Sequence, residues 1–304
     1  MKKSEIRKDY ILDKYVIIAP RRSKRPQQIT EASVVITPVS PFTIDQVKKN
    51  LIIDSLGKGA HKIIVIKNIY SAVSLQNKKA YGSQEVIVDI QDPTIRQADF
   101  SEAHIISLLN MYSRRVKAMA KLPKMEYILC FKNEGAASGA SIQHEHSQIF
   151  GSNFVSPEVQ LEAATVKQYF QEHGTSFYSD LIKKEMKSQR RVYEDKYVAA
   201  FAPYASAYQY EVWIFTKRPV DNISMLNRNE VVSLAKVLKN ILEKLKKLNL
   251  PYNYFTRQII SDKHQHFCLK IEPRVSIWAG VELDSGLIIN SVPPEEAAKY
   301  YRKK

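Results

Sequence analysis

The sequence predicts an α+β fold built from two tandem copies of one unit, each an antiparallel sheet with a packed helix. Read by hydrophobic period, the chain gives two strands, a helix and two strands, and then the same order again. The connections between neighbouring strands are short, which suits antiparallel pairing. With 304 residues, the chain is long enough to bury a large core in one or two domains.

The first copy is expected to occupy residues 1–170. Its helix is indicated by apolar residues that recur on one face, namely Ile105, Leu108, Leu109, Tyr112 and Val116. Its predicted elements are strands at 61–74 and 84–91, a helix over 99–119, and strands at 125–133 and 141–150. A short leading strand is also compatible with the pattern.

The second copy is expected to occupy residues 171–304. Asn227 and Glu230 have the spacing of an N-cap and its capping-box partner at the start of the helix. The predicted elements are strands at 191–204 and 210–218, a helix over 227–248, and strands at 252–260 and 266–274. Ser156 followed by Pro157 predicts the start of a helix that connects the two copies.

Composition restricts the class of protein. Hydrophobic residues make up 44% of the chain and charged residues 25%. No apolar run approaches the roughly 20 residues that cross a membrane, and no apolar stretch follows the basic first residues, so we expect neither a membrane span nor a signal peptide. With only two cysteines, a reducing cytoplasmic location is expected. The net charge of +15 favours polyanionic partners, although lysines on solvated helix faces are the simpler explanation.

Residues 139–150, GASIQHEHSQIF, hold the most distinctive motif of the chain. On a strand, His144, His146 and Gln148 would point to one face. The small residues just upstream, Gly135 to Ser141, would let backbone N–H groups approach a phosphate. An imidazole placed there could attack phosphorus, and the amide could donate to the phosphoryl oxygens. A zinc-binding histidine pair or two half-buried strand histidines are the alternatives.

These features resemble the galactose-1-phosphate uridylyltransferases and their relatives, the ADP-glucose phosphorylases, which form a branch of the histidine-triad superfamily. Four stretches in order carry the resemblance, at residues 7–26, 131–148, 204–218 and 279–303. The resemblance implies two fused triad-like units. It also implies a ping-pong transfer of a nucleoside monophosphate through a nucleotidyl-histidine, between a nucleotide sugar and either a sugar phosphate or inorganic phosphate.

The resemblance also assigns site residues. His146 would be the nucleophile and Gln148 the donor to the phosphoryl group. The expected substrate-binding residues are Arg22, Arg25, Asn68, Phe131, Asn133, Gly139, Ser141, His144 and Glu282. For the two arginines a solvated basic loop is the alternative, and for Asn68 an ordinary strand end. In the family, the segment containing Glu282 reaches the sugar, often across a dimer interface, so a homodimer is expected.

The chain departs from the family where many members hold zinc. Ser40 and Thr43 replace a pair of cysteines, and Gln84 stands where a histidine is expected, so only His144 remains. Hydroxyl groups are poor zinc ligands compared with thiolate and imidazole. We therefore expect no zinc cofactor, and a polar cluster of these four side chains in its place.

The second copy shows the same loss, since Ser176 and Ser179 accompany His266. A residual metal site formed by Glu162, His264 and His266 is left open.

The first functional hypothesis is a UDP-glucose–hexose-1-phosphate uridylyltransferase. The alternative within the class is an ADP-glucose phosphorylase with inorganic phosphate as acceptor, to which Ser147 gives a hint. A nucleotide- or RNA-binding relative without catalysis is the alternative from another class. We expect no nucleic-acid partner, because no RNA-reading motif is present.

Overall fold

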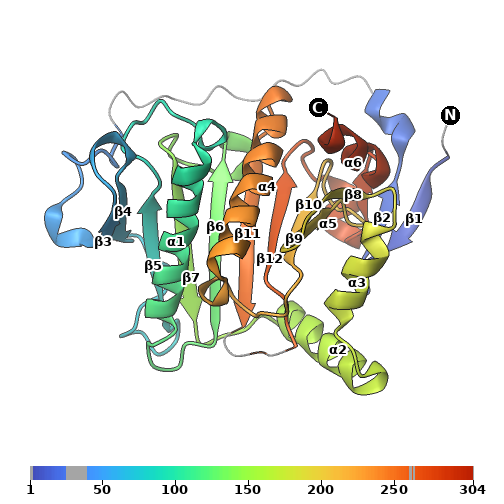
Figure 1. Ribbon diagram of the computed structural model, residues 1–304, viewed down its shortest axis with the longest axis horizontal. Helices are drawn as coiled ribbons and strands as arrows, with labels where there is room; N and C mark the ends of the chain where they lie inside the picture. Colours follow the sequence, from blue (N-terminus) through green and yellow to red (C-terminus); the bar gives the residue numbers. More distant parts are fainter. Residues whose placement is uncertain (1–2, 25–39, 260–261, 263, 304) are drawn as a thin grey trace.

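A computed structural model describes residues 3–24, 40–259, 262 and 264–303. Its centre is one ten-stranded antiparallel sheet that runs across the whole molecule (Figure 1). In spatial order the strands are β3 (Ile52–Leu56), β4 (Ile63–Lys67), β5 (Gly82–Val88), β7 (His146–Ser152), β6 (Tyr127–Glu134), β11 (Tyr252–Ile259), β12 (Cys268–Pro273), β10 (Val212–Thr216), β9 (Val198–Phe201) and β8 (Arg191–Glu194).

The sheet consists of two halves with the same strand order. Counted from the outer edge of the sheet inward, the first half has the order β3, β4, β5, β7, β6 and the second half has the order β8, β9, β10, β12, β11. In both halves the last two strands are therefore exchanged relative to their order in the chain. The halves join where β6 pairs with β11, with Phe131 opposite Phe255 and Asn133 opposite Asn253. The predicted α+β class and the repetition are confirmed, while the boundary at residue 170 stays a prediction.

Two long helices cover one face of the sheet, α1 (Glu102–Met119) and α4 (Arg228–Lys247), and they pack against each other in front of it (Figure 1). The apolar face predicted for the first helix is buried. The capping box predicted at Asn227 and Glu230 is present, which fixes where α4 begins. One hydrophobic core beneath these helices includes residues of both halves.

The remaining elements extend the second half. They are helices α2 (Pro157–His173), α3 (Phe177–Met186), α5 (Gly280–Ser285) and α6 (Pro294–Arg302), and a small sheet of β1 (Glu5–Lys8), β2 (Tyr15–Ile18) and β13 (Ile288–Asn290). Short 3₁₀ turns lie at η1 (Pro20–Lys24), η2 (Lys49–Leu51), η3 (Gly59–His61), η4 (Gln97–Asp99), η5 (Ala136–Ser138) and η6 (Ile223–Met225). Helix α2 begins as predicted, since the Ser156 side chain accepts from the Val159 N–H and Pro157 is the first helical residue.

Three predicted strands have clearly different limits in the structure, and one of them, β7, predicted over 141–150, begins only at His146. The strand predicted over 61–74 ends at Lys67, because the Asn68 side chain accepts from the Tyr70 N–H and turns the chain. The strand predicted over 191–204 is a hairpin of β8 and β9, in which Asp195 accepts from the N–H groups of Tyr197 and Val198.

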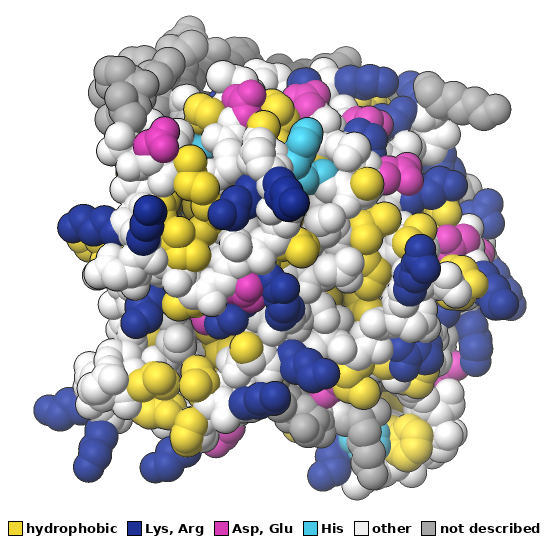
Figure 2. All heavy atoms as spheres, turned by 60° about the vertical axis from the view of Figure 1, so that its left-hand side comes forward, with side chains coloured by type: hydrophobic (Ala, Val, Ile, Leu, Met, Phe, Trp, Pro, Cys, Tyr) yellow, Lys and Arg dark blue, Asp and Glu magenta, His cyan; other side chains and the backbone are white. Residues whose placement is uncertain are grey.

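The surface does not concentrate its positive charge on the side that Figure 2 presents, where Lys and Arg side chains are scattered among uncharged ones. Among the residues that the structure describes, no helix is both long and apolar enough to cross a bilayer.

Candidate active site

Strand β7 begins at His146, so His144 lies before the strand. The expectation that both histidines share one strand face is therefore wrong for His144. Gln148 lies opposite Phe131 of β6 and Val86 of β5, and His146 lies opposite Val88. Since residues two apart in a strand point to the same face, His146 and Gln148 face the side of the sheet that the two long helices leave uncovered.

The His144 ring is held by hydrogen bonds at both nitrogens. Nδ1 lies 2.7 Å from the Ser40 hydroxyl and Nε2 lies 2.7 Å from the Ile90 carbonyl oxygen. Burial lowers the pKa of this imidazole, so it is neutral at neutral pH. With both nitrogens engaged, His144 fits a structural role.

The His146 ring is oriented by its own neighbour. Nδ1 lies 2.8 Å from the His144 carbonyl oxygen, and because a carbonyl only accepts, the proton belongs on Nδ1. Burial, followed by the positive charge of Lys132, lowers the pKa of the imidazole. The lone pair therefore resides on Nε2, for which the described part of the chain offers no hydrogen-bond donor. This is the protonation state that a histidine nucleophile needs.

A buried charge network lies directly behind β7. The Lys132 ammonium is 2.9 Å from Asp89 and 3.2 Å from the His146 carbonyl oxygen, and it forms an ion pair with Glu145. The Ser147 hydroxyl donates to Asp89 at 2.8 Å. Burial would lower the pKa of Lys132, but the two carboxylates outweigh it and raise that pKa. The network thus fixes the His146 carbonyl oxygen and the side chains of both neighbouring residues, Glu145 and Ser147.

Sequence reasoning missed this network. The available signal was the alternation in β6, where Ile128, Cys130 and Lys132 share the helix-covered face. A lysine at a buried position requires a carboxylate partner. The partners themselves, Asp89 and Glu145, could not be paired with Lys132 from the sequence, because they come from other segments.

A cavity of about 430 Å³ opens beside His146. Its polar lining comes from the loop before β7, the end of β6, and the segments around residues 40 and 96. These lining residues are Ser40, Arg96, Lys132, Asn133, Glu134, Ser141, Gln143, His144, Glu145, His146 and Asn249. The predicted residues Asn133, Ser141, His144 and His146 are thus brought together around one space.

The loop between β6 and β7 needs its glycines. Gly135 has φ of 82°, and a Cβ there would lie 2.8 Å from the Cβ of Pro251. Gly139 has φ of 85° and is exposed. The loop is tied to the second half of the sheet, because the Asn253 amide donates to Asn133 at 2.7 Å and to the Ser138 carbonyl oxygen at 2.9 Å.

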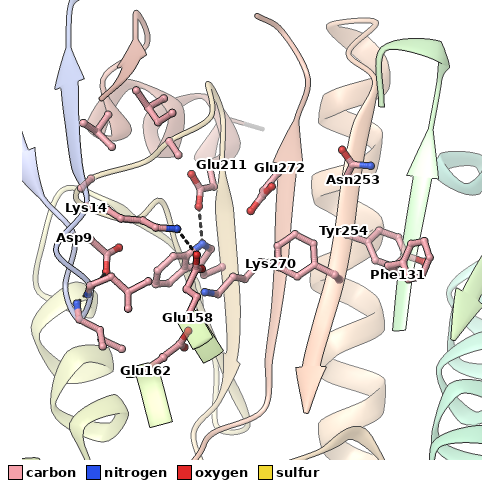
Figure 3. Close-up of a pocket in the computed structure, with 18 of the residues that line it drawn as sticks. Asp9, Lys14, Phe131, Glu158, Glu162, Glu211, Asn253, Tyr254, Lys270 and Glu272 are labelled. Atoms are coloured by element: carbon pink, nitrogen blue, oxygen red, sulfur yellow. Dashed lines mark hydrogen bonds and ion pairs between the residues drawn. The ribbon is translucent and has the colours of Figure 1, made fainter. Parts of the chain in front are cut away.

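A second cavity, of about 440 Å³, lies on the face of the second half opposite the two long helices, between the sheet and residues of the N-terminal segment and α2. In Figure 3 the side chain of Glu211, just before β10, and those of Lys270 and Glu272 of β12 extend toward it. Burial, followed by the nearby Glu272, raises the pKa of Glu211 to about 8. Phe131 and Asn133 line this cavity, and Asn133 also lines the first one, so the two cavities adjoin at that residue.

The other predicted binding residues lie outside the linings of these two cavities. Arg22 is exposed on η1, Asn68 ends β4, and the Glu282 carboxylate accepts from the Ala279 N–H at the start of α5. Arg25 lies outside the described residues. Gln148 follows His146 along β7, and its carbonyl oxygen accepts from the Gln84 amide at 3.0 Å.

The positions at which the family resemblance implies a zinc site do not suit that ion here. Ser40 bonds to His144, and the Thr43 hydroxyl donates to the Ser40 carbonyl oxygen at 3.3 Å. Gln84 bonds to Gln148, so its predicted place beside His144 is wrong. Two hydroxyls and one imidazole with both nitrogens engaged make a poor donor set for zinc.

The second half repeats this arrangement. The His266 Nε2 lies 3.1 Å from the Ser176 hydroxyl and 3.4 Å from the Ser179 hydroxyl, and Nδ1 lies 3.2 Å from the Thr216 carbonyl oxygen. Within residues 3–24, 40–259, 262 and 264–303, no three His, Cys, Asp or Glu side chains gather as a metal site. Glu162, His264 and His266 are all described, and the structure does not assemble them into one.

Comparison with known proteins identifies relatives over the whole chain. The family model for the N-terminal domain of galactose-1-phosphate uridyl transferase matches residues 57–156. The ADP-glucose phosphorylase of Arabidopsis thaliana is 31% identical over 98% of this chain and 92% of its own length. The galactose-1-phosphate uridylyltransferase of Thermotoga maritima is 26% identical over 98% of each chain.

Solved structures agree with these relatives. The crystal structure of an ADP-glucose phosphorylase from Arabidopsis thaliana with bound ADP-glucose superposes with a TM-score of 0.85, at 28% identity over 99% of each chain. A uridylyltransferase structure superposes with a TM-score of 0.74, at 25% identity over 98% of this chain and 97% of that one.

Proposed function

This chain belongs to the family of galactose-1-phosphate uridylyltransferases and ADP-glucose phosphorylases, and on that premise we propose that His146 transfers a nucleoside monophosphate from a nucleotide sugar to a phosphate-bearing acceptor. The observation that carries the proposal is the fixed ring of His146, which lines the loop cavity and has its Nδ1 held at the His144 carbonyl oxygen.

The first step forms a covalent intermediate. The Nε2 lone pair attacks the α-phosphorus, a P–N bond forms, and the P–O bond to the sugar phosphate breaks. The sugar phosphate leaves with the electron pair of that bond. The imidazole then carries a positive charge, which the His144 carbonyl oxygen stabilises by accepting from the Nδ1–H.

The second step returns the enzyme to its starting state. A phosphate oxygen of the acceptor attacks the same phosphorus, a P–O bond forms, and the P–N bond breaks. The imidazole regains its neutral form without a net proton transfer. Because Gln84 engages the carbonyl oxygen of Gln148, the amide NH₂ of Gln148 is free to donate to the phosphoryl oxygens in both steps.

For the substrate we favour ADP-glucose, with inorganic phosphate as the acceptor and ADP and glucose 1-phosphate as products. Support comes from the phosphorylase relative, which has the higher identity and the higher TM-score of the two compared. UDP-glucose with hexose 1-phosphate, the first hypothesis from the sequence, is the second candidate, because a uridylyltransferase matches over 98% of both chains.

A labelling panel distinguishes these substrates. Mixing the protein with ADP-glucose or UDP-glucose, without acceptor, should add one nucleoside monophosphate to His146, detectable by intact-mass spectrometry. We expect AMP to label faster than UMP, and phosphate to release ADP from the labelled protein. If neither nucleotide sugar labels the protein, the proposed transfer is wrong, and the hypothesis of a non-catalytic nucleotide-binding relative is supported.

The segment around α5 exposes Ile277, Val281 and Leu283, with 86%, 52% and 72% of their surfaces accessible. We propose that this apolar segment contacts a second copy in a homodimer, which analytical ultracentrifugation would detect. We also propose that the protein works without zinc, which elemental analysis tests, and that it is cytoplasmic.

A further inference from the structure

The cavity beside His146 is lined by a cationic side chain that has no role in the transfer described above. Two cationic side chains line this cavity, Lys132 and Arg96. Lys132 is buried, and its ammonium is already engaged by Asp89, Glu145 and the His146 carbonyl oxygen. Its three donors are therefore used within the protein. Arg96 is in a different situation.

Arg96 stands just before η4, with 37% of its side chain exposed. Its Nη1 donates to the Gln143 carbonyl oxygen at 2.6 Å and lies 3.8 Å from a Glu145 carboxylate oxygen. These two contacts hold the guanidinium against the loop that leads to His146. A guanidinium has five N–H donors, and in the described part of the chain only this one hydrogen bond uses them.

The charge balance of the cavity depends on this arginine. Burial, followed by Glu145, raises the pKa of Glu134 to about 8, so Glu134 is largely neutral at pH 7. The carboxylates of Glu145 and Asp89 together outweigh the single charge of Lys132. Without Arg96 the lining would therefore carry no net positive charge, since Glu145 balances Lys132. The buried Asp89 behind the lining would add a negative charge that opposes phosphate binding.

We propose that Arg96, together with the Ser141 hydroxyl and the backbone N–H groups of Ala140 and Ser141, binds the phosphate group that is not transferred. That group is the phosphate of the departing sugar phosphate and, in the second step, of the incoming acceptor. One subsite serves both, because each must lie on the side of phosphorus opposite the His146 nitrogen. This inference rests on the proposed function and adds a binding residue to it.

A guanidinium suits this task, because its paired N–H groups match two oxygens of a free phosphate dianion. Two ligands should therefore respond differently to loss of this side chain. The affinity for inorganic phosphate should depend on Arg96. The affinity for a nucleoside monophosphate should not, because its single phosphate occupies the position of the transferred group.

The test uses the full chain, with Arg96→Gln and Arg96→Lys as variants and Arg114→Gln as the matched control. Arg114 is an exposed arginine of α1 that pairs with Asp54. Calorimetry measures the Kd of inorganic phosphate and of AMP and UMP. We expect Arg96→Gln to weaken phosphate binding by about 10- to 100-fold, as for a lost charge-assisted contact. Arg96→Lys should recover part of the loss, with nucleoside monophosphates changed less than about 2-fold.

Three results would overturn the inference. The first is unchanged phosphate binding in Arg96→Gln. The second is an equal loss of affinity for phosphate and for nucleoside monophosphates, which would indicate a purely structural role for the loop contact. The third is the absence of phosphate binding by the unmodified protein. Because calorimetry needs no nucleotidyl adduct, a failed labelling experiment and a failed phosphate subsite are distinguishable. Melting curves of both Arg96 variants establish that they are folded.

Discussion

Each half of the sheet has a histidine that bonds to a serine just before a strand begins, but only the first half has the candidate nucleophile. In the first half, His144 bonds to Ser40 two residues before β7 starts. In the second half, His266 bonds to Ser176 two residues before β12 starts. His266 is thus the counterpart of His144, although it is the second histidine of its own His-x-His.

The strand register extends this correspondence to the reactive positions. Gln148 lies opposite Phe131, and Lys270 lies opposite Phe255. Cys268 therefore stands where the first half has His146, and Lys270 where it has Gln148. Lys132 follows Phe131 in β6 and Thr256 follows Phe255 in β11, so Lys132 corresponds to Thr256. The second half has kept the histidine that supports the strand and lacks the nucleophile, its amide partner and the buried lysine behind them.

Among the substitutions that test this difference, removal of the nucleophile should have the largest effect, and it should lower the turnover rate. We expect His146→Ala to lower turnover by about 10⁴-fold or more, because the covalent step has no other nitrogen to use. Cys268→Ala, at the corresponding position of the second half, should stay within about 2-fold. Steady-state assays with ADP-glucose and phosphate measure both. Comparable losses in the two variants would mean that the halves share the catalysis.

Removing the buried lysine tests the second difference. Lys132→Met leaves the Asp89 and Glu145 carboxylates buried without their cation. A loss of about 3–5 kcal/mol in the free energy of unfolding is expected from breaking such a pair. Thr256→Val should cost only about 1 kcal/mol, the value of one hydrogen bond. Urea denaturation of both variants gives the comparison, and equal losses would refute the asymmetry.

The pH dependence of stability should carry the signature of His266. Burial lowers its pKa from the ordinary 6.5 to about 4. Because the unfolded chain binds the proton more tightly, stability is full above about pH 6.5 and declines as the pH falls toward 4. The loss attributable to His266 between pH 7 and pH 5 is about 2 kcal/mol.

Replacing this histidine supplies the control. In His266→Gln, urea denaturation at pH 7 and pH 5 should show a decline smaller by that amount, even though the variant is less stable at pH 7. An unchanged pH dependence would show that His266 is charged in the folded protein or exposed to solvent.

The smallest expected effect concerns the serine contacts at the positions where the family resemblance implies zinc ligands. Ser40→Ala and Ser176→Ala each remove a hydroxyl from a buried imidazole. Each should lower the free energy of unfolding by about 1 kcal/mol. Thermal melting with and without EDTA should give the same midpoint for the unmodified protein. A midpoint lowered by EDTA would contradict metal-free folding.

The sequence was sufficient for whatever depends on local periodicity. The repeated strand and helix order, the apolar face of α1 and the capping box of α4 could all be predicted from residues close together in the chain. The meeting of Asn133, Ser141 and His146 followed from the family motif. What could not be predicted depends on pairing between distant segments.

Three examples show the limit. Alternating polarity suggested that β7 starts before His144, but contacts with Ser40 and Ile90 from distant segments hold that ring outside the ladder. The partner of Gln84 is Gln148, because β5 and β7 pair in a register that spacing alone does not give. The equivalence of His266 with His144, rather than with His146, emerges only from where each strand begins.

If only the first half of the sheet holds the nucleophile, only that half should become labelled. The experiment is to incubate the protein with ADP-glucose in the absence of phosphate, digest it under mildly alkaline conditions, and map the labelled peptide by mass spectrometry. We expect one AMP per chain, attached to His146. Label on a second-half residue such as Cys268, or two labels per chain, would contradict it.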